Sequence, residues 1–456
     1  MRPELNARRI ATYFTYRYIP GTETLFEGIR RVPPGAYLNY DLATGKYQIH
    51  RYWDYRLDRV NPDMSIDAAE DQFYDLFSDA VKIRLRSDVE VGSLISGGID
   101  SSAVSARVAD CQPSVPLFSV AFEENQYNEL SAVNKFLARH PARFGSAVLS
   151  TTLCRKDALE RLPQIVKSLE EPISLGTLIP TDMVCEMAAK QVKVVLTGEG
   201  ADEIFGGYRK FMIEQAAVQF QHSAPEHQQA LLQAFPELKR YLVQRKDDPG
   251  ERYIQNEVLF DPDEVVRLTG CHLPENFYDV DAIPDLAGVE DPVNQFIAYE
   301  TRFRLPDYVI LRLDRLSMRH SPEARTPFLD YRLAEFAATL PVQLKVNTDA
   351  IREKFICGRT YAKFDILDRE TAYRRKQPFT IPMADWLSAP KTLPDFLKDI
   401  LWGDVIRRQG IFDPGYVRIL ARQVSARGVG PETLVSSADQ VFAIIIFTLW
   451  HEAFFS

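Results

Sequence analysis

The segment Ser96-Gly97-Gly98-Ile99-Asp100-Ser101-Ser102 decides the fold of this chain, because it joins a predicted strand to a predicted helix. The strand is the apolar run Val91 to Ile95. Two adjacent glycines let the backbone turn tightly and come close to an anion. The exposed N–H groups at the start of a helix favour negative charge. The sequence therefore predicts a cradle for phosphate groups at the carboxyl end of a strand.

The polar side chains of this segment indicate how the phosphates are held. Ser96, Ser101 and Ser102 supply short hydroxyl donors, whereas the carboxylate of Asp100 would repel phosphate unless a divalent cation lay between them. Asp100 is therefore a predicted magnesium ligand. The segment lacks both the Gly-Lys-Ser/Thr ending of a Walker loop and the Gly-x-Gly-x-x-Gly of a dinucleotide fingerprint. The simpler alternative is a glycine turn with an acidic residue at the helix start.

A second acidic cluster follows another apolar strand, Val192 to Leu196. The stretch Thr197 to Tyr208 contains Glu199, Asp202 and Glu203 among four glycines. These carboxylates could simply favour the positive end of a helix dipole. If the two loops lie side by side, however, Asp100 and Asp202 can share one magnesium ion between phosphate oxygens, and we favour this interpretation.

The order of the predicted elements indicates the fold class. Strands are expected at 91–95, 116–121, 147–149 and 191–196, and helices at 101–110, 128–140 and across 155–190. This alternation predicts an α/β fold with a parallel, doubly wound sheet, whose ligands bind at the carboxyl ends of the strands. The chain from residue 205 onward is expected to form a largely helical C-terminal lobe, interrupted by a Pro- and Asp-rich stretch at 261–292.

The N-terminal residues have a different composition. Residues 1–55 are rich in aromatic residues, Gly and Pro, with hairpin-like alternation from Ala36 to Tyr47, and are interpreted as an arm packed on the domain formed by 56–456. Ser65 is a predicted N-cap, because Phe73, Leu76, Phe77 and Ala80 after it follow the spacing of an amphipathic helix.

Composition excludes several classes of protein. The 456 residues carry a formal charge of −9, which argues against a nucleic-acid partner. The apolar run Phe442 to Trp450 is too short to span a bilayer, and no signal-peptide pattern is visible, so we expect a cytoplasmic protein without a membrane partner. The five cysteines include no Cys-x-x-Cys pair, which argues against zinc and disulfides and predicts reduced core thiols.

Five ordered segments resemble motifs of a known family. The first segment is similar to the loop of N-type ATP pyrophosphatases, and together they resemble the synthetase domain of glutamine-dependent asparagine synthetases. The segments are Ser96 to Ser102, Thr197 to Tyr208, Asp314 to Met318, Glu323 to Asp330 and Arg374 to Phe379. The resemblance implies the PP-loop fold (adenine nucleotide alpha hydrolase-like), with ATP and Mg²⁺ as cofactors.

The resemblance also implies roles for particular residues. Asp100 and Asp202 match magnesium ligands, and Glu199 matches a glutamate near the reacting carboxylate and ammonia. Lys376 matches a lysine that contacts phosphate, although three consecutive cations are by themselves also typical of a solvated turn. The residues expected around ATP and pyrophosphate are Leu94, Ser96, Gly97, Gly98, Asp100, Ser101, Ser102, Val120, Gly198 and Lys376. Asp314-Arg315 and Glu323-Ala324-Arg325 are expected to form buried ion pairs that fix helix packing. A contribution of both segments to the acceptor pocket stays a weaker option.

The chain also departs from the family. Full-length members begin with a glutaminase domain that has an N-terminal cysteine nucleophile, whereas Arg2 follows Met1 here and Cys111 is the first cysteine. Residues 8–55 resemble the junction after that domain. We therefore expect the synthetase half, truncated or naturally separate, with ammonia from the medium or from a separate glutaminase subunit. The loop Glu171 to Thr177 lacks the acidic or Ser/Thr-rich character that is common in relatives, which leaves the acid substrate open.

The sequence thus predicts an ATP-dependent amide-forming ligase. Adenylation of a small carboxylate, with aspartate favoured, is followed by transfer of ammonia or another amine and release of AMP and pyrophosphate. One alternative is the same chemistry on a different acid in specialised metabolism, as in asparagine synthetase-like or β-lactam-forming enzymes. Another is a catalytically silent, partner-binding subunit. A tRNA-thiolating relative would need a catalytic cysteine pair and a basic face, and the sequence shows neither.

Overall fold

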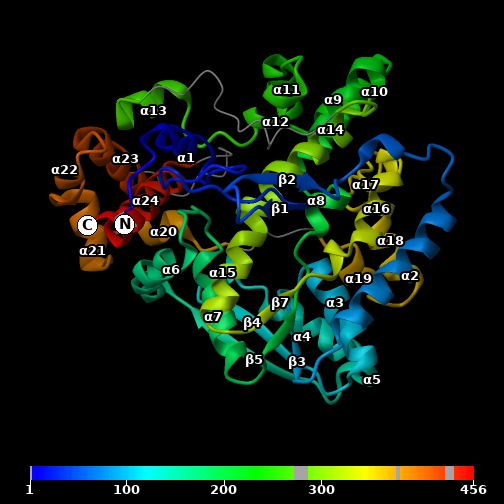
Figure 1. Ribbon diagram of the computed structural model, residues 1–456. Coiled ribbons are helices and arrows are strands. Elements are labelled where there is room, and N and C mark those ends of the chain that lie inside the picture. Colours follow the sequence, from blue (N-terminus) through cyan, green and yellow to red (C-terminus); the bar gives the residue numbers. More distant parts are fainter. Residues whose placement is uncertain (1–2, 272–285, 376–379, 427–435) are drawn as a thin grey trace.

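A five-stranded parallel sheet lies in the lower half of the protein as drawn in Figure 1. The computed structural model describes residues 3–271, 286–375, 380–426 and 436–456. The strands lie in the order β5-β4-β3-β6-β7 and are all parallel to their neighbours. They are β3 (Val91–Leu94), β4 (Pro116–Phe122), β5 (Val148–Cys154), β6 (Val194–Leu196) and β7 (Glu323–Arg325). The predicted α/β fold with a parallel sheet is confirmed.

The direction of winding reverses at β3. From β3 the chain adds β4 and β5 on one side and then returns to place β6 on the other side. Ser93 is consequently paired with Leu117 of β4 and with Leu196 of β6. Ligands of open parallel sheets bind where the winding reverses, beyond the carboxyl ends of the strands. The loops that follow β3 and β6 open at this position.

Successive residues of a strand point to opposite sides of the sheet, so the apolar strands present an apolar surface on each side. Helices cover both surfaces. Leu117, Val194 and Leu196 pack into one apolar cluster, whereas Phe118 and Val195 pack into the other. The first cluster contains side chains of α2 (Ile66–Arg84), α3 (Ile99–Cys111), α4 (Leu130–Arg139), α5 (Pro141–Phe144), α8 (Ala201–Phe205), α16 (Tyr331–Thr339) and α18 (Phe355–Lys363). The second contains side chains of α6 (Leu162–Leu169), α7 (Leu178–Ala189) and α15 (Leu311–Arg319).

The predicted C-terminal lobe is largely helical. Its first part comprises α9 (Arg209–His222), α10 (Pro225–Ala234), α11 (Leu238–Gln244), α12 (Pro249–Gln255), α13 (Pro262–Thr269), α14 (Pro292–Tyr299) and the π-helix η6 (Glu300–Ile310). Its last part comprises α17 (Val342–Lys345), α19 (Arg369–Ala372), α20 (Met383–Leu387), α21 (Asp395–Trp402), α22 (Val405–Gln409), α23 (Pro414–Ala426) and α24 (Ser437–Phe455). An interruption of the helices was expected at 261–292, but helix α13 begins directly after Asp261, which caps it with a capping box. The prediction is therefore wrong for the first part of this stretch.

The C-terminal helix α24 is the one helix in the described residues that is long and apolar enough to cross a membrane. Val441 to Trp450 are nonetheless buried in the protein core. The helix packs against α6 and α23 and against α1 (Ile10–Tyr16), where Tyr13 donates a hydrogen bond to the carbonyl of Ala443. Packing within the protein therefore accounts for its apolar sequence.

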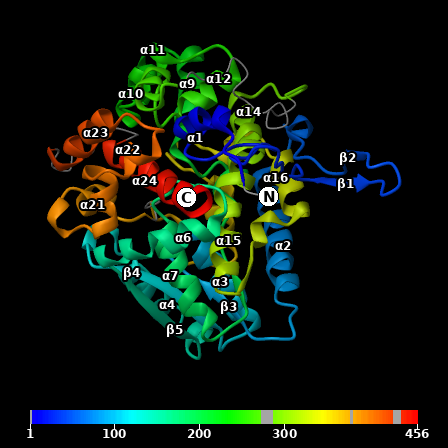
Figure 2. The same ribbon diagram turned by 60° about the vertical axis from the view of Figure 1, so that its left-hand side comes forward.

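The N-terminal residues form two parts with different environments. All residues of α1 are buried, with Phe14 packed against Phe260, Phe412 and Phe447. The predicted hairpin is present as β1 (Ala36–Tyr40) and β2 (Tyr47–Arg51), and it projects away from the rest of the molecule (Figure 2). The division of the chain at residue 55 stays a prediction.

Several local predictions are corrected or confirmed. Ser65 caps α2 as expected, because its hydroxyl accepts a hydrogen bond from the backbone N–H of Ala68. The strand β7 was not predicted; with three residues it is too short for an alternating pattern to be visible. The five cysteines are free, but Cys111 is exposed and Cys271 partly exposed, so only three of them are core thiols.

Remaining short segments connect these elements. They are the 3₁₀ turns η1 (Ala7–Arg9), η2 (Leu57–Arg59), η3 (Asn125–Tyr127), η4 (Lys156–Arg161), η7 (Pro327–Leu329) and η8 (Pro390–Thr392).

Candidate functional site

A cavity of about 520 Å³ lies beyond the carboxyl ends of β3 and β6, at the reversal of winding. It is lined by most of the residues that the sequence singled out. These are Leu94, Ser96, Gly97, Gly98, Asp100, Ser101, Val120, Gly198, Glu199 and Asp202. The fold thus gathers residues from three strand ends into one place, although the role predicted for each of them stays a prediction. Lys376 lies outside the described residues.

The first loop is shaped by its own glycine and serine residues. Gly97 has a φ of +80°, a left-handed conformation that side chains rarely adopt. The Ser101 hydroxyl accepts a hydrogen bond from the backbone N–H of Ser96 and lies 3.0 Å from the Ser96 hydroxyl. Gly98 is the N-cap of α3 and offers no side chain for capping. The first turn of α3 therefore faces the cavity without a capping oxygen, as an anion site requires.

Ser102 differs from the other predicted phosphate-binding residues. Its side chain is fully buried in the first turn of α3, and it is not part of the lining of the cavity. Its hydroxyl has no hydrogen-bond partner among the described residues. A buried hydroxyl without a partner costs stability, so this group remains available to a ligand that penetrates the loop.

The second loop contacts the first one through Gly198. A Cβ atom at this position would lie 2.6 Å from the backbone nitrogen of Ser101 and 2.9 Å from the carbonyl carbon of Asp100. No real side chain fits at such distances, so only glycine allows this approach. Gly207 allows a similar approach to Asp202, whose Oδ1 would lie 2.0 Å from an added Cβ. The loops consequently bring Asp100 and Asp202 to the same wall of the cavity.

Glu203, the third carboxylate of the cluster, faces away from the cavity. Its side chain is buried and accepts a hydrogen bond of 2.5 Å from the hydroxyl of Tyr208. Burial raises the pKa of Glu203 to about 7, and the charge of Asp202 adds to this effect. Glu203 therefore stabilises the second loop from the protein interior, through its hydrogen bond with Tyr208.

A lysine that sequence analysis missed lies between the two aspartates. The Lys354 Nζ donates to Asp100 Oδ2 and lies 2.7 Å from Asp202 Oδ1. Burial by itself would lower the pKa of Lys354, but the two carboxylates raise it above its ordinary value, so the side chain is a cation. One ammonium touches both carboxylates, which shows that they converge on a common position.

The backbone at Lys354 is held in an uncommon conformation. Its φ is +46° and its ψ +46°, at the start of α18, in a turn that also places Ile351 at a φ of +50°. Such a conformation is uncommon for residues other than glycine and is found more often at functional sites. No sequence motif predicts the position of Lys354 at this site. Lys354 is 152 residues away from Asp202 along the chain and contacts it only in the folded protein.

The two carboxylates suit a magnesium ion. Their hard oxygens are the ligand type that Mg²⁺ prefers, and Mg²⁺ usually takes one or two carboxylates together with phosphate oxygens. The described residues contain no group of three or more His, Cys, Asp or Glu side chains that could hold a metal by themselves. The position already attracts a cation in the form of Lys354. The site therefore fits a metal that arrives with a nucleotide.

Glu199, on the other side of the cavity, is oriented by a second missed residue. The Arg312 guanidinium, from α15, donates to Glu199 Oε1 and to the hydroxyl of Thr177. The Arg312 side chain is 4% exposed, whereas that of Glu199 is 32% exposed and reaches the cavity. Arg312 precedes the Asp314-Arg315 pair by two residues in the sequence. Its apolar sequence neighbours gave no indication that it contacts Glu199.

The ion pairs expected from Asp314-Arg315 and Glu323-Ala324-Arg325 are not buried. Arg315 pairs with Glu170, and both side chains are exposed. Arg325 pairs with the exposed Glu323 and donates to the backbone carbonyls of Arg84 and Arg86. The expectation of buried ion pairs is therefore wrong, although Arg325 connects β7 to the end of α2 through these two carbonyls.

The basic turn before Lys376 reaches the phosphate loop. Arg374 donates to the carbonyl of Gly97 and to Glu129 Oε1, and Arg374 and Arg375 both line the cavity. Glu129 is 7% exposed, and its burial raises its pKa to about 7, although Arg374 opposes the shift. With Lys354, Arg209 and Arg352, five basic residues therefore line a cavity that is expected to take phosphate.

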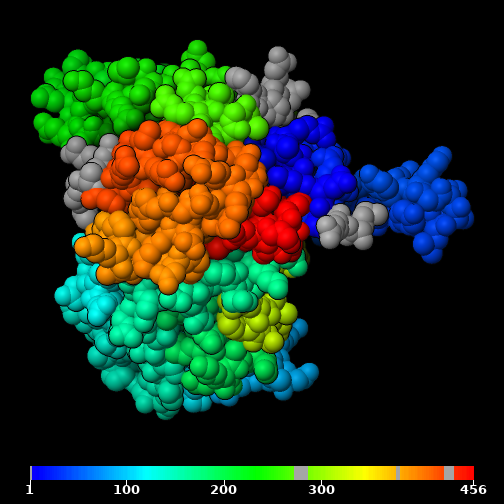
Figure 3. All heavy atoms as spheres, turned by 90° about the vertical axis from the view of Figure 1, so that its left-hand side faces the viewer, coloured from blue at the N-terminus to red at the C-terminus, as the bar shows by residue number. Residues whose placement is uncertain are grey.

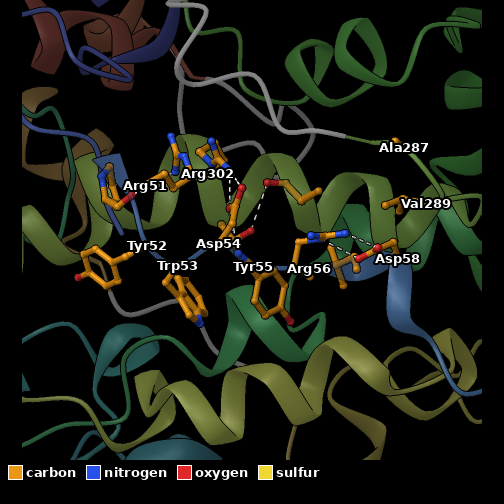
Figure 4. A pocket seen from close by; sticks show the side chains of 14 residues that line it. Arg51, Tyr52, Trp53, Asp54, Tyr55, Arg56, Asp58, Ala287, Val289 and Arg302 are labelled. Carbon is orange, nitrogen blue, oxygen red and sulfur yellow. Dashed lines mark hydrogen bonds and ion pairs between the residues drawn. The ribbon is translucent and has the colours of Figure 1, made fainter. Parts of the chain in front are cut away.

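A second cavity, of about 370 Å³, lies at the base of the hairpin (Figure 4). Most of the charges around it are compensated within the protein: Asp54 pairs with Arg302, and Arg56 pairs with Asp58. None of the predicted site residues lines it. We therefore assign the predicted chemistry to the cavity at the sheet.

The contact at Gly198 generates a prediction. Gly198→Ala should push the second loop away from the start of α3 and lower nucleotide affinity at least tenfold, because the two aspartates would no longer converge. Isothermal titration with Mg²⁺ and ATP measures this affinity. Gln229→Ala, at an exposed position on α10, is a control. Equal nucleotide affinity in the Gly198 variant and the unmodified protein would contradict the prediction.

The raised pKa of Glu129 generates another prediction. The folded protein holds this carboxyl protonated at pH values where the unfolded chain has released the proton. Its contribution to stability is therefore present at pH 4.5 and below and is lost as the pH rises towards 7. The free energy of unfolding of the unmodified protein should decrease relative to Glu129→Gln by roughly 2–3 kcal/mol between pH 4.5 and 8. Urea denaturation at both pH values, with the exposed Glu123→Gln as control, measures the difference. A difference independent of pH would refute the assignment.

Comparison with known proteins places the chain in a family. The asparagine synthase family matches residues 72–452. Asparagine synthetase [glutamine-hydrolyzing] 1 of Bacillus subtilis is 25% identical over 98% of this chain and 69% of its own length. Asparagine synthetase [glutamine-hydrolyzing] 3 of the same organism is 27% identical over 86% of this chain and 59% of its length. Amidase chry2 of Gibberella zeae is 26% identical over 80% of this chain and 60% of its length. With its sheet, its nucleotide-sized cavity and a match over most of its length, the chain belongs to the asparagine synthase family of ATP-dependent amide-forming ligases.

Proposed function

We propose that this protein adenylates a small carboxylic acid with ATP and transfers ammonia or another amine to the activated acyl group. The observation that carries the proposal is the convergence of Asp100 and Asp202 on one cation-binding position beside the uncapped start of α3. An anion of high charge is accommodated at such a place when a divalent ion accompanies it.

The first step forms the acyl-adenylate. A carboxylate oxygen of the acid attacks the α-phosphorus of ATP, the bond to the bridging oxygen of the β-phosphate breaks, and pyrophosphate leaves. Magnesium, held by Asp100 and Asp202, would neutralise charge on the phosphate oxygens. The loop Ser96–Ser102 holds the leaving pyrophosphate, and Lys354, Arg374 and Arg375 supply positive charge around it. Leu94, Val120 and Gly198 surround the adenosine. Lys376 is part of the proposal by its resemblance alone.

The second step forms the amide. The nitrogen attacks the acyl carbon, the bond to the adenylate oxygen breaks, and AMP leaves while the nitrogen loses a proton. Glu199 lies at the same cavity and is held in one orientation by Arg312. A positioned carboxylate can accept a proton from the incoming nitrogen. We assign this function to Glu199 and a positioning function to Arg312.

One observation keeps an acid other than aspartate as a second candidate. The part of the cavity wall contributed by α7 and α15 consists of Thr181, Val184 and Leu313. Polar groups of the adjoining loop are used within the protein: Tyr308 donates to the carbonyl of Ser174, and Arg312 donates to Thr177. Because a second carboxylate needs a cation or several donors, an acid with an apolar body fits this wall as well as aspartate does. Aspartate stays the first candidate, and such an acid is the second.

The nitrogen source is the remaining part of the proposal. We propose ammonia, supplied from the medium or by a glutamine-hydrolysing unit, because the two Bacillus subtilis relatives are named as glutamine-hydrolysing. We also propose residues 1–55 as a distinct N-terminal arm, residues 56–456 as the catalytic domain, and a cytoplasmic location.

ATP–pyrophosphate exchange across a panel of carboxylic acids tests the proposal. We expect one acid to stimulate exchange, and amide formation with ammonium to depend on the same acid. Stimulation by an apolar acid without stimulation by aspartate would select the second candidate. If no acid stimulated exchange and ATP did not bind, the protein would be a silent subunit.

Asp100→Asn generates a sharper prediction. The neutral amide cannot balance the charge of a magnesium ion, so the exchange rate should fall by roughly 10²–10³-fold, as for other removed electrostatic contacts at reacting phosphates and oxyanions. Asp88→Asn, an exposed position before β3, should keep the full rate. Circular dichroism checks that both variants are folded. An unchanged rate in a folded Asp100→Asn variant would rule out the metal-binding role.

A further inference from the structure

The segment Glu171–Thr177, which joins α6 to α7, is a buried loop. It has neither helical nor strand structure, and six of its seven residues are buried. Connecting segments usually run over the surface, because a buried loop carries backbone polar groups that all need partners. The helix α7 begins directly after the loop and contributes Thr181 and Val184 to the wall of the cavity. The loop therefore lies next to the candidate site.

Three distant parts of the chain satisfy the backbone of this loop. The Ser174 N–H donates to the carbonyl of Arg17 in the N-terminal arm, at 2.9 Å. The Ser174 carbonyl accepts a hydrogen bond of 3.1 Å from the hydroxyl of Tyr308 in η6. The Gly176 carbonyl accepts one of 3.4 Å from the backbone N–H of Ile381. The loop is consequently held from several sides at once.

The arm and the C-terminal helix also cover the start of the loop. The buried Glu171 carboxylate accepts a hydrogen bond from the backbone N–H of Leu25 and lies 3.6 Å from the guanidinium of Arg31. Trp450 of α24 donates to the carbonyl of Glu170, at 2.7 Å. Figure 3 shows the end of the chain, in red, at the surface between the arm, in dark blue, and the green segment that contains α6 and α7. These contacts fix the end of the loop that is remote from the cavity.

The last residue of the loop is connected to Glu199 through one side chain. The hydroxyl of Thr177, a buried residue, accepts a hydrogen bond from Nη1 of Arg312, and Nη2 of the same guanidinium donates to Glu199 Oε1. A guanidinium is planar, and its donors point in fixed directions. Fixing one of its nitrogens therefore also fixes the direction in which the other donates.

Close packing beside Thr177 limits other positions of the loop. A Cβ atom added at Gly176 would lie 2.2 Å from Thr380 Oγ1 and 3.4 Å from Met383 Cε. The neighbouring side chains thus fill the space on this side of the loop. The Thr177 hydroxyl is held in place before any substrate binds, as preorganised groups of an active site are.

We propose that Thr177 is a positioning residue for the amide-forming step. Its hydroxyl fixes the Arg312 guanidinium, which binds Oε1 of Glu199. The other carboxylate oxygen, Oε2, has no hydrogen-bond partner in the described part of the chain and takes the proton that the incoming nitrogen releases. This inference rests on the proposed function, because it concerns the second step of that reaction.

The two partial reactions test the proposal separately. Formation of the acyl-adenylate transfers no proton, so ATP–pyrophosphate exchange should be independent of Thr177, whereas amide formation with ammonium should depend on it. Thr177→Val removes the hydroxyl at nearly constant volume. It should slow amide formation in a single turnover by roughly 10–10²-fold, as small misplacements of reacting groups do, and leave the exchange rate unchanged.

Matched variants control for a change in packing. Thr177→Ser keeps the hydroxyl and should keep most of both rates. Thr448→Val is the control at another buried threonine, on α24, whose hydroxyl has no hydrogen-bond partner among the described residues, and both rates should be unchanged. Circular dichroism checks that each variant is folded. If Thr177→Val is not, Thr177→Ala provides the same loss of the hydroxyl.

A double variant shows whether Thr177 acts through Glu199. The amide of Glu199→Gln does not take up the proton, so this variant already lacks the function that Thr177 supports. Amide formation by Thr177→Val/Glu199→Gln should therefore be as slow as that of Glu199→Gln alone, because two residues that act through one group are not additive. Losses that multiply would mean that Thr177 stabilises another part of the protein, and they overturn the proposal.

The remaining outcomes are equally decisive. Loss of amide formation alone, restored in Thr177→Ser, supports the proposal. Equal loss of both partial reactions in a folded Thr177→Val variant, or amide formation at the full rate, overturns it and leaves the proposed function intact. If no acid stimulated exchange by the unmodified protein, the proposed function itself would fail, and this inference with it, before any variant is compared.

Discussion

The close approach of two strand-end loops at Gly198 is the constraint on which the candidate site depends. Because residue 198 has no Cβ, the loop after β6 can lie against the first turn of α3. Asp100 and Asp202, which are 102 residues apart in the chain, then share one position. The parallel sheet makes this geometry possible, since β3 and β6 are hydrogen-bonded neighbours and both end at the same edge.

Charge compensation maintains this arrangement. Two carboxylates at a partly buried place repel one another unless a cation lies between them, and Lys354 provides that cation. Under the proposed function, the same ammonium would also meet phosphate oxygens when a nucleotide enters with magnesium. A similar pair lies across the cavity, where the buried guanidinium of Arg312 fixes the orientation of Glu199, a carboxylate that lines the cavity. The site is thus an alternation of positive and negative groups on a rigid sheet edge.

The hairpin differs from the rest of the protein in the exposure of its aromatic residues. The core of the protein buries its aromatic residues, as α1 does with Phe14, whereas β1 and β2 expose tyrosines on a projecting ribbon. An apolar surface that the chain itself does not cover is best explained by an interface.

The sequence by itself determined four of the five strands of the sheet and the two loops that follow β3 and β6, because each depends on local signals: an apolar strand, adjacent glycines and a helix start. It also predicted Ser65 as a helix N-cap and hairpin-like alternation from Ala36 to Tyr47, whereas the structure extends the second strand of the hairpin to Arg51. Only the tertiary structure revealed Lys354 and Arg312, since a single basic residue has no local pattern and acquires its role from carboxylates more than a hundred residues away. The same reason explains why Ser102 and Glu203 were grouped with the cavity although they are buried behind it. Spacing along the chain predicts which segments turn, but the direction of each side chain is decided by packing.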